Sequence, residues 1–199
     1  MGLQLTYKRC RLWQKIIFSD EAHFDLGEYV NKQNCLIWGT ENPHVYIEKP
    51  THPKRVTVWC GFWSRGLIEA FFFENEQAEV VTVNGDRYRV MLNEFLFTKI
   101  EEGDIGNVLF QQDGATCRTA ETALDVLRPV FEDRILSRRA DVVWPPRSCD
   151  LTLLDYYLCS AVKHKCYTDK PQTIDALKDN IREAICEIQL HTIDNVLKN

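Results

Sequence analysis

Hydrophobic positions form short runs in the first part of the chain. Residues 15–19 (KIIFS) are an apolar run that predicts a strand buried on both faces. The β-branched and aromatic run at 55–63 (RVTVWCGFW) predicts a second strand, and LIEAFFF at 67–73 predicts a third. The mixed pattern over 27–38 also favours a strand, and the three prolines within 43–53 favour a loop.

A helical period replaces these runs after residue 85. Apolar side chains recur four residues apart, at Met91 and Phe95 for example, and predict a helix over 86–100. An Asn84–Gly85 turn signal precedes this helix, and glycines from Gly103 onwards end it.

The remaining segments alternate between strand and helix. The pattern predicts a strand at 107–112, a helix at 118–128 stopped by Pro129, a strand at 141–144, a helix at 152–167 and a last helix capped by Thr173. The last helix carries an apolar face of Ile174, Leu177, Ile181, Ile185 and Ile188. This order favours a mixed α/β domain, with a central sheet flanked by helices.

Composition agrees with a globular domain. The chain has 199 residues, of which 45% are hydrophobic and 27% charged, and it contains no repeat or linker. No apolar run approaches the ~20 residues that span a bilayer, so we expect no membrane partner. The net charge of −5 does not favour DNA binding, because nucleic-acid-binding domains are usually basic.

The cysteines and histidines indicate neither a disulfide framework nor a zinc site. Eight cysteines form no CxxC pair, and the five histidines lack ligand spacing. The N-terminus carries no signal peptide. We therefore expect reduced thiols in an intracellular protein.

Three carboxylates are candidates for metal binding and catalysis. Asp20 and Asp113 each follow an apolar run (IIFSDE and VLFQQDG), and ligands gather at the carboxyl ends of strands in α/β sheets. Asp155 lies near the start of the helix at 152–167, where the helix dipole favours an acid. Three such acids could hold two divalent cations for phosphoryl transfer. Spacing alone leaves open that Asp20 and Asp113 are ordinary loop or capping residues.

The segments FSDEAHF, QQDGATCRTA and WPPRSCDLTLLDYYL, in this order, resemble mariner-like transposases. The resemblance implies a ribonuclease H-like catalytic domain over 15–199, preceded by a short extension at 1–14. It implies that Asp20, Asp113 and Asp155 are the catalytic, metal-binding acids of a DDE/D triad, that Asp150 is not, and that the cofactor is Mg²⁺ or Mn²⁺, as two ions.

The activity implied by the resemblance is metal-dependent DNA strand cleavage and strand transfer, with transposon ends and target DNA as partners and the nucleus as location. Family members carry an N-terminal helix-turn-helix region, and only about a dozen residues precede the first catalytic strand here. We therefore expect weak DNA binding. The helical pattern of the last nine residues stops abruptly, so we also expect a C-terminal truncation. A homodimer is left open.

Several residues depart from the family pattern. Arg118 stands where the family commonly has histidine and Cys159 where it commonly has tryptophan, while Thr116, Cys149 and Leu153 stand where it commonly has proline. Arginine cannot titrate near neutral pH, as histidine can. These changes leave two alternatives open: a non-catalytic remnant acting as a protein-interaction module, and a generic metal-dependent nuclease.

Residues near the candidate acids have plainer interpretations. Glu21 and Asp25 are expected to be solvated, and His23 to be an ordinary surface or half-buried histidine. The tryptophans Trp38, Trp59 and Trp63 are expected in the core. The basic residues 163–165 could line a DNA backbone path, but a solvated surface is the favoured interpretation.

Overall fold

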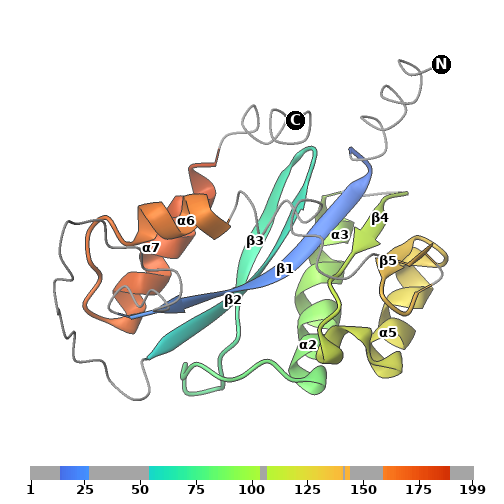
Figure 1. Ribbon diagram of the computed structural model, residues 1–199, viewed down its shortest axis with the longest axis horizontal. Helices are drawn as coiled ribbons and strands as arrows, with labels where there is room; N and C mark the ends of the chain where they lie inside the picture. The colour runs from blue at the N-terminus through green and yellow to red at the C-terminus, as the bar shows by residue number, and fades with distance from the viewer. Residues whose placement is uncertain (1–13, 27–53, 104–106, 141, 144–158, 189–199) are drawn as a thin grey trace, which may run out of the picture.

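The central feature is a six-stranded mixed sheet with the strand order β3-β2-β1-β4-β5-β6. A computed structural model of the chain describes residues 14–26, 54–103, 107–140, 142–143 and 159–188 (Figure 1). The strands are β1 (Ile16–Asp25), β2 (Arg55–Trp63), β3 (Gly66–Phe72), β4 (Leu109–Gln111), β5 (Ile135–Ser137) and β6 (Val142–Val143). The first three pair antiparallel, whereas β1, β4, β5 and β6 pair parallel.

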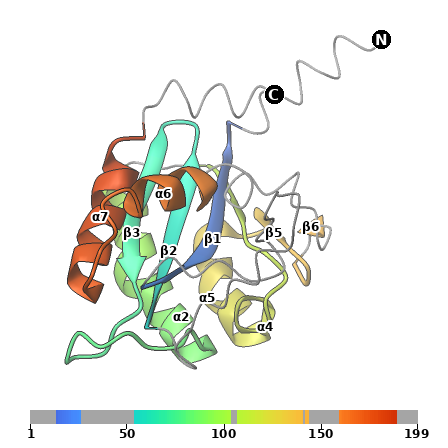
Figure 2. The ribbon, with the colours of Figure 1, turned by 60° about the vertical axis from the view of Figure 1, so that its left-hand side comes forward.

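Helices cover both faces of this sheet. They are α2 (Gly85–Met91), the π-helical turn η2 (Leu92–Leu96), α3 (Phe97–Glu102), α4 (Thr116–Thr119), α5 (Glu121–Phe131), α6 (Cys159–Cys166) and α7 (Ile174–Cys186). In Figure 2, α6 and α7 lie in front of the strands, with α2 and α5 behind them. The predicted mixed central sheet flanked by helices is confirmed.

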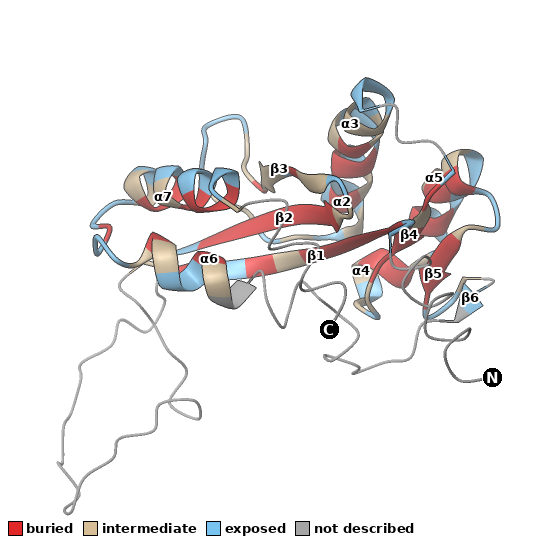
Figure 3. Ribbon diagram, turned by 90° about the horizontal axis from the view of Figure 1, so that it is seen from above, coloured by how far each residue is buried: buried red, intermediate tan, exposed pale blue. Residues whose placement is uncertain are grey.

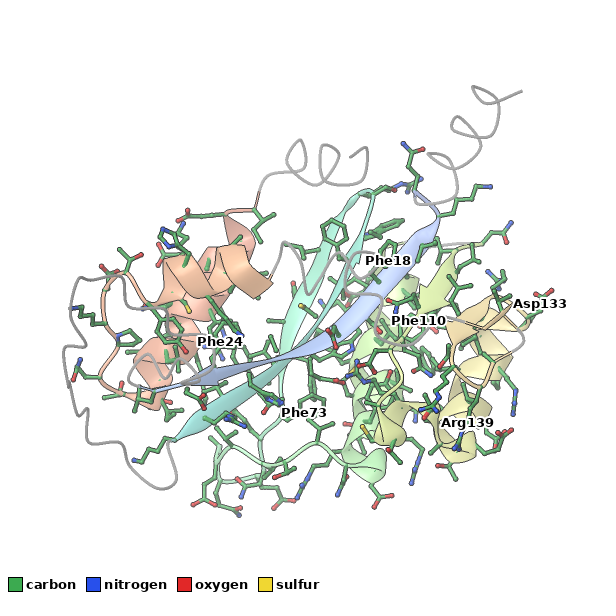
Figure 4. All side chains as sticks on the ribbon, in the orientation of Figure 1. Phe18, Phe24, Phe73, Phe110, Asp133 and Arg139 are labelled. Atoms are coloured by element: carbon green, nitrogen blue, oxygen red, sulfur yellow. The ribbon has the colours of Figure 1, made fainter. Side chains whose placement is uncertain are left out.

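Two hydrophobic cores form because side chains alternate along β1. Phe18 and Phe24 point into the core that α6 and α7 cover, whereas Ile17 points into the core that includes Phe110 and the helices α2 and α5. Figure 3 shows β1 and β2 buried along much of their length, and Figure 4 places Phe24 beside α6 and α7. The prediction of a strand buried on both faces is confirmed.

The strand that carries Asp20 is longer than predicted. The apolar run suggested a strand ending at residue 19, but β1 continues to Asp25. Antiparallel pairing with β2 runs from Phe18 to Asp25, whereas parallel pairing with β4 stops at Phe18. The polar second half of β1 is therefore held by its partner strand rather than by its own hydrophobicity, and Asp20 lies in mid-strand rather than at the strand's end.

The helix predicted at 118–128 is wrong in its boundaries. The segment divides at Ala120, whose ψ of 141° is extended, and α5 then continues through Pro129 to Phe131. Pro129 removes one backbone hydrogen bond in the last turn. Pro129 itself is exposed, and the buried Leu127 and Phe131 hold the turn in place.

Two further local features were not foreseen. Asn84, at the predicted turn signal, is the N-cap of α2, and its side chain accepts a hydrogen bond from the Arg87 amide. Strand β5 was not predicted, because three buried residues are too few to show a periodic pattern.

Most other elements are confirmed where the structure describes them. These are the strands at 55–63 and 67–73, the long helix after residue 85, the short strands around 109 and 142, and the last helix with its Thr173 cap. The predictions for 27–38, 43–53 and the first part of 152–167 lie outside the described residues. Within the described part of the chain, no helix is long and apolar enough to cross a membrane.

Candidate functional site

Asp20 and Asp113 are brought together by the parallel pairing of β1 with β4. In that register Phe18 lies opposite Gln111, and each of the two acids follows two residues later. Ser19 strengthens this junction, since its hydroxyl donates a 2.8 Å hydrogen bond to the Gln111 carbonyl. The sheet register therefore places both predicted acids at one point, beyond the last pair of the β1–β4 ladder.

The side chain of Arg118 lies where Asp20 and Asp113 come together. Its Nη1 lies 2.8 Å from Asp20 Oδ1, its Nη2 2.7 Å from Glu21 Oε2 and its Nε 2.9 Å from Asp113 Oδ1. The Arg118 side chain is only 6% exposed. One buried guanidinium thus contacts three carboxylates, which we call the acidic cluster: Asp20, Glu21 and Asp113.

The two neighbouring acids of β1 can share one arginine because the guanidinium is a planar fork with several donors. Consecutive strand residues point to opposite faces of a sheet. At Asp20 and Glu21, however, β4 has already ended, so the fork can lie beside the edge of β1 and reach both side chains.

A buried side chain, Gln112, holds the backbone that carries Arg118. Gln112 Nε2 donates to the Arg118 carbonyl at 2.8 Å and to Ser137 Oγ at 3.2 Å. The Tyr88 hydroxyl donates to Gln112 Oε1 at 2.9 Å. Gln112 is fully buried, so α2, β5 and the turn α4 are joined behind the acidic cluster.

The charges of the acidic cluster do not balance. Burial raises the pKa of Glu21 to about 7; Arg118 opposes this rise, while Asp20 and Asp113 add to it. Burial alone would lower the pKa of Arg118, but attraction by Glu21 and the two aspartates outweighs it and raises that pKa. Arg118 is therefore always charged, and one positive charge faces up to three negative charges.

We expect Glu21 to make stability depend on pH. Between its ordinary pKa of 4.5 and its folded value of about 7, the folded protein binds more protons than the unfolded chain. The free energy of unfolding therefore falls as the pH rises through this window, by on the order of 2–3 kcal/mol. Urea unfolding of Glu21→Gln should show a flatter dependence than the unaltered chain. Parallel curves for the two proteins would contradict this assignment.

A cavity of ≈ 490 Å³ opens beside the acidic cluster. Its lining includes Glu21, Cys117 and Arg118 together with His23 and Thr57. His23 Nδ1 lies 3.0 Å from Thr57 Oγ1, and burial, followed by the charge of Arg55, lowers the pKa of His23. The cavity is the space through which a ligand can approach Glu21 and Arg118.

Some residues singled out in the sequence have the predicted environment in the structure, and others do not. Glu21 and Asp25 are not solvated as predicted: the Glu21 side chain is 7% exposed, and Asp25 forms a 2.7 Å ion pair with Arg55. Trp59 is fully buried, which confirms its assignment to the core. Asp155 lies outside the described residues.

Sequence reasoning missed two features of the site. Arg118 was noticed as a departure from the family pattern, but its role as the partner of three acids was not foreseen. Gln112 carried no signal beyond its place next to Asp113, because a buried glutamine at the end of a strand resembles any polar loop residue.

The donor atoms of the acidic cluster suit a divalent metal in kind, but their arrangement does not. Carboxylate oxygens are the ligands that Mg²⁺ and Mn²⁺ prefer. Within the described part of the chain, however, no three His, Cys, Asp or Glu side chains are arranged to hold a metal ion. The guanidinium of Arg118 lies between the oxygens that a metal would need to share.

The fold is ribonuclease H-like, as the sequence analysis predicted. The catalytic domain of Mos1 mariner transposase is similar, with a TM-score of 0.65 and 19% identity over 98% of this chain and 81% of that one. The predicted resemblance to mariner-like catalytic domains is thus confirmed at the level of the fold. No protein-family profile and no curated protein matches the sequence.

Complexes of Mos1 are similar as well. Its strand transfer complex has a TM-score of 0.72 at 18% identity, over 98% of this chain and 54% of that chain. Its paired-end complex with the left transposon end has a TM-score of 0.71 at 17% identity, over 98% and 55%. The chain therefore spans about half the length of the transposase chains in these complexes.

Proposed function

We propose that this chain is a transposase-type catalytic domain that cleaves DNA strands and transfers them to a target. One observation carries the proposal: Asp20 and Asp113, which occupy the acid positions of the motifs, meet at the end of the β1–β4 ladder in a fold shared with the Mos1 catalytic domain. The partners would be transposon-end and target DNA, and the location the nucleus.

The cofactor we propose is Mg²⁺ or Mn²⁺, as two ions. The similar structures include Mos1 complexes named with Mn and with Mg. Asp20 and Asp113, together with Asp155, are the residues that would hold the ions. Such ions, when bound, stabilise negative charge on a phosphodiester during in-line displacement. The chain's own carboxylates would position them, and the DNA backbone would approach through the cavity beside Glu21 and Arg118.

DNA binding by this chain alone should be weak. The net charge is −5, and phosphate contacts by basic residues supply most non-specific affinity for DNA. We therefore expect binding to be measurable only at low salt and high DNA concentration.

A specific observation favours the second candidate, a non-catalytic remnant. The buried Arg118 is bonded to Asp20 and approaches Asp113 to 2.9 Å, so the acids proposed for catalysis are already paired. In that case the fold would persist for protein contacts, including a homodimer, without catalysis.

A strand-joining assay separates these functions. A labelled DNA duplex with a free 3′-hydroxyl is incubated with supercoiled plasmid and Mn²⁺, with the unaltered chain and with Arg118→His. The proposed function predicts labelled, relaxed plasmid with Arg118→His, and loss of the product to background when Asp113→Asn is added to that variant. Relaxation without label indicates a generic nuclease, and no change in the plasmid with either protein indicates the remnant.

A further inference from the structure

We propose that the guanidinium of Arg118 is the resident cation of the acidic cluster and that it competes with divalent metal for Asp20 and Asp113. This inference rests on the proposed function, since it concerns regulation of the same site. In the chain as it stands, this single side chain excludes metal from the two acids.

Arg118 engages all three acids, although its Nε forms an ion pair with Asp113 without a hydrogen bond. Three different nitrogens of one guanidinium lie within 2.9 Å of three carboxylates. Asp20 Oδ1 accepts from Arg118 and also from the Glu21 amide at 2.8 Å. Asp113 Oδ1 accepts from the Ala115 amide at 2.8 Å while it faces Arg118 Nε. Oδ1 of Asp20 and Oδ1 of Asp113 are therefore each already engaged by Arg118 and by a backbone amide.

A metal ion and Arg118 cannot share this space without a large repulsion. The guanidinium stays protonated at all ordinary pH values, so it cannot give way by losing its charge. A divalent cation held by the same carboxylates would lie close to this positive charge in a buried setting, where screening by water and salt is weak. Arg118 must therefore leave the cluster before metal can enter.

Arg118 is also held in place from behind. Its carbonyl accepts a hydrogen bond from the fully buried Gln112, which fixes the short turn α4 against the sheet. The side chain enters the cluster from this fixed backbone, so its position is determined by the fold and not by surface mobility.

The acidic cluster nevertheless still attracts a cation, because one of its carboxylate oxygens is not satisfied. Among the described residues, Glu21 Oε1 is buried and has no hydrogen-bond partner. Removal of the guanidinium would leave the buried Asp20 and Glu21 and the partly exposed Asp113 facing one another, and an unpaired buried charge is costly. A variant without this guanidinium should therefore recruit a divalent cation.

The test counts bound Mn²⁺ by the loss of the free-ion EPR signal and follows the melting temperature in the same titration. The proteins are the unaltered chain, Arg118→Met, Arg118→His and the control Arg128→Met. Arg128 also contacts two carboxylates, but its side chain is 45% exposed on the surface of α5. We expect Arg118→Met to bind Mn²⁺ about 100-fold more tightly than the unaltered chain or more. Its melting temperature should rise with Mn²⁺, whereas that of Arg128→Met should not.

The outcomes are distinguishable. Equal Mn²⁺ affinity in the unaltered chain and in both Arg118 variants overturns the inference, as does failure of both variants to bind. Asp113→Asn in the Arg118→His background must abolish the gain, or the metal lies elsewhere and the inference is wrong. If Arg118→Met does not fold, Arg118→His and the unaltered chain decide. Metal binding without strand joining supports the inference and contradicts the proposed function, whereas strand joining by an unaltered chain that binds metal tightly does the reverse.

Discussion

Replacing Arg118 with methionine is expected to lower the free energy of unfolding by about 3–5 kcal/mol in metal-free buffer. The side chain is 6% exposed and is the cation shared by Asp20, Glu21 and Asp113. Methionine keeps the apolar length of the chain but leaves the three carboxylates unpaired. Urea unfolding at neutral pH, with chelator present, measures the loss.

The matched control is Arg128→Met. Arg128 contacts Glu121 and Asp125 at the surface, where water and salt screen the charges. Its loss should cost no more than ~1 kcal/mol. The penalty at Arg118 should also shrink as the pH falls toward 5, because protonation of Glu21, whose pKa is about 7, relieves the repulsion. Equal penalties for the two variants would contradict the central role of Arg118.

The second large effect is expected for Gln112→Leu, which should cost about 3 kcal/mol or more. Leucine has a similar size but cannot bond the Tyr88 hydroxyl, Ser137 Oγ or the Arg118 carbonyl. Each buried polar group left without a partner costs about 1–3 kcal/mol. Chemical unfolding of the purified variant gives the value.

Tyr88→Phe is the natural comparison for Gln112→Leu. It removes the Tyr88 hydroxyl and leaves the other two hydrogen bonds of Gln112 in place. Its expected cost is about 1 kcal/mol. If the two variants lost the same free energy, Gln112 would not be the residue that joins α2, β5 and α4.

Local pattern was sufficient for the elements that carry their own signal. The run at 55–63, the helical period after residue 85 and the Thr173 cap predicted β2, the α2–α3 helix and α7 correctly. The sequence pattern failed to predict the structure where pairing or packing with another segment overrides the local conformational preference. The polar half of β1 is a strand because β2 pairs with it, and α5 tolerates Pro129 because its buried face holds the last turn.

For the candidate site, too, some features could be predicted from the sequence and others could not. The positions of Asp20 and Asp113 after apolar runs, and the resemblance of the motifs around them, sufficed to predict two acids that meet. The burial of Glu21 could not be predicted, because nothing in its neighbours distinguishes it from a solvated acid. Its environment depends on Arg118, which binds the adjacent Asp20 from 98 residues away.

Hydrophobic periodicity and residue type thus specified most strands and helices, and the resemblance of short motifs indicated Asp20 and Asp113, because these are properties of short segments. The pairing of those acids with a buried guanidinium depends on the parallel register of β1 and β4, on the end of β4 at Gln111 and on the turn α4 that returns Arg118 to the sheet. Each of these is a contact between distant segments. The charge state of the site is therefore a property of the folded chain, in which burial and long-range ion pairing act together.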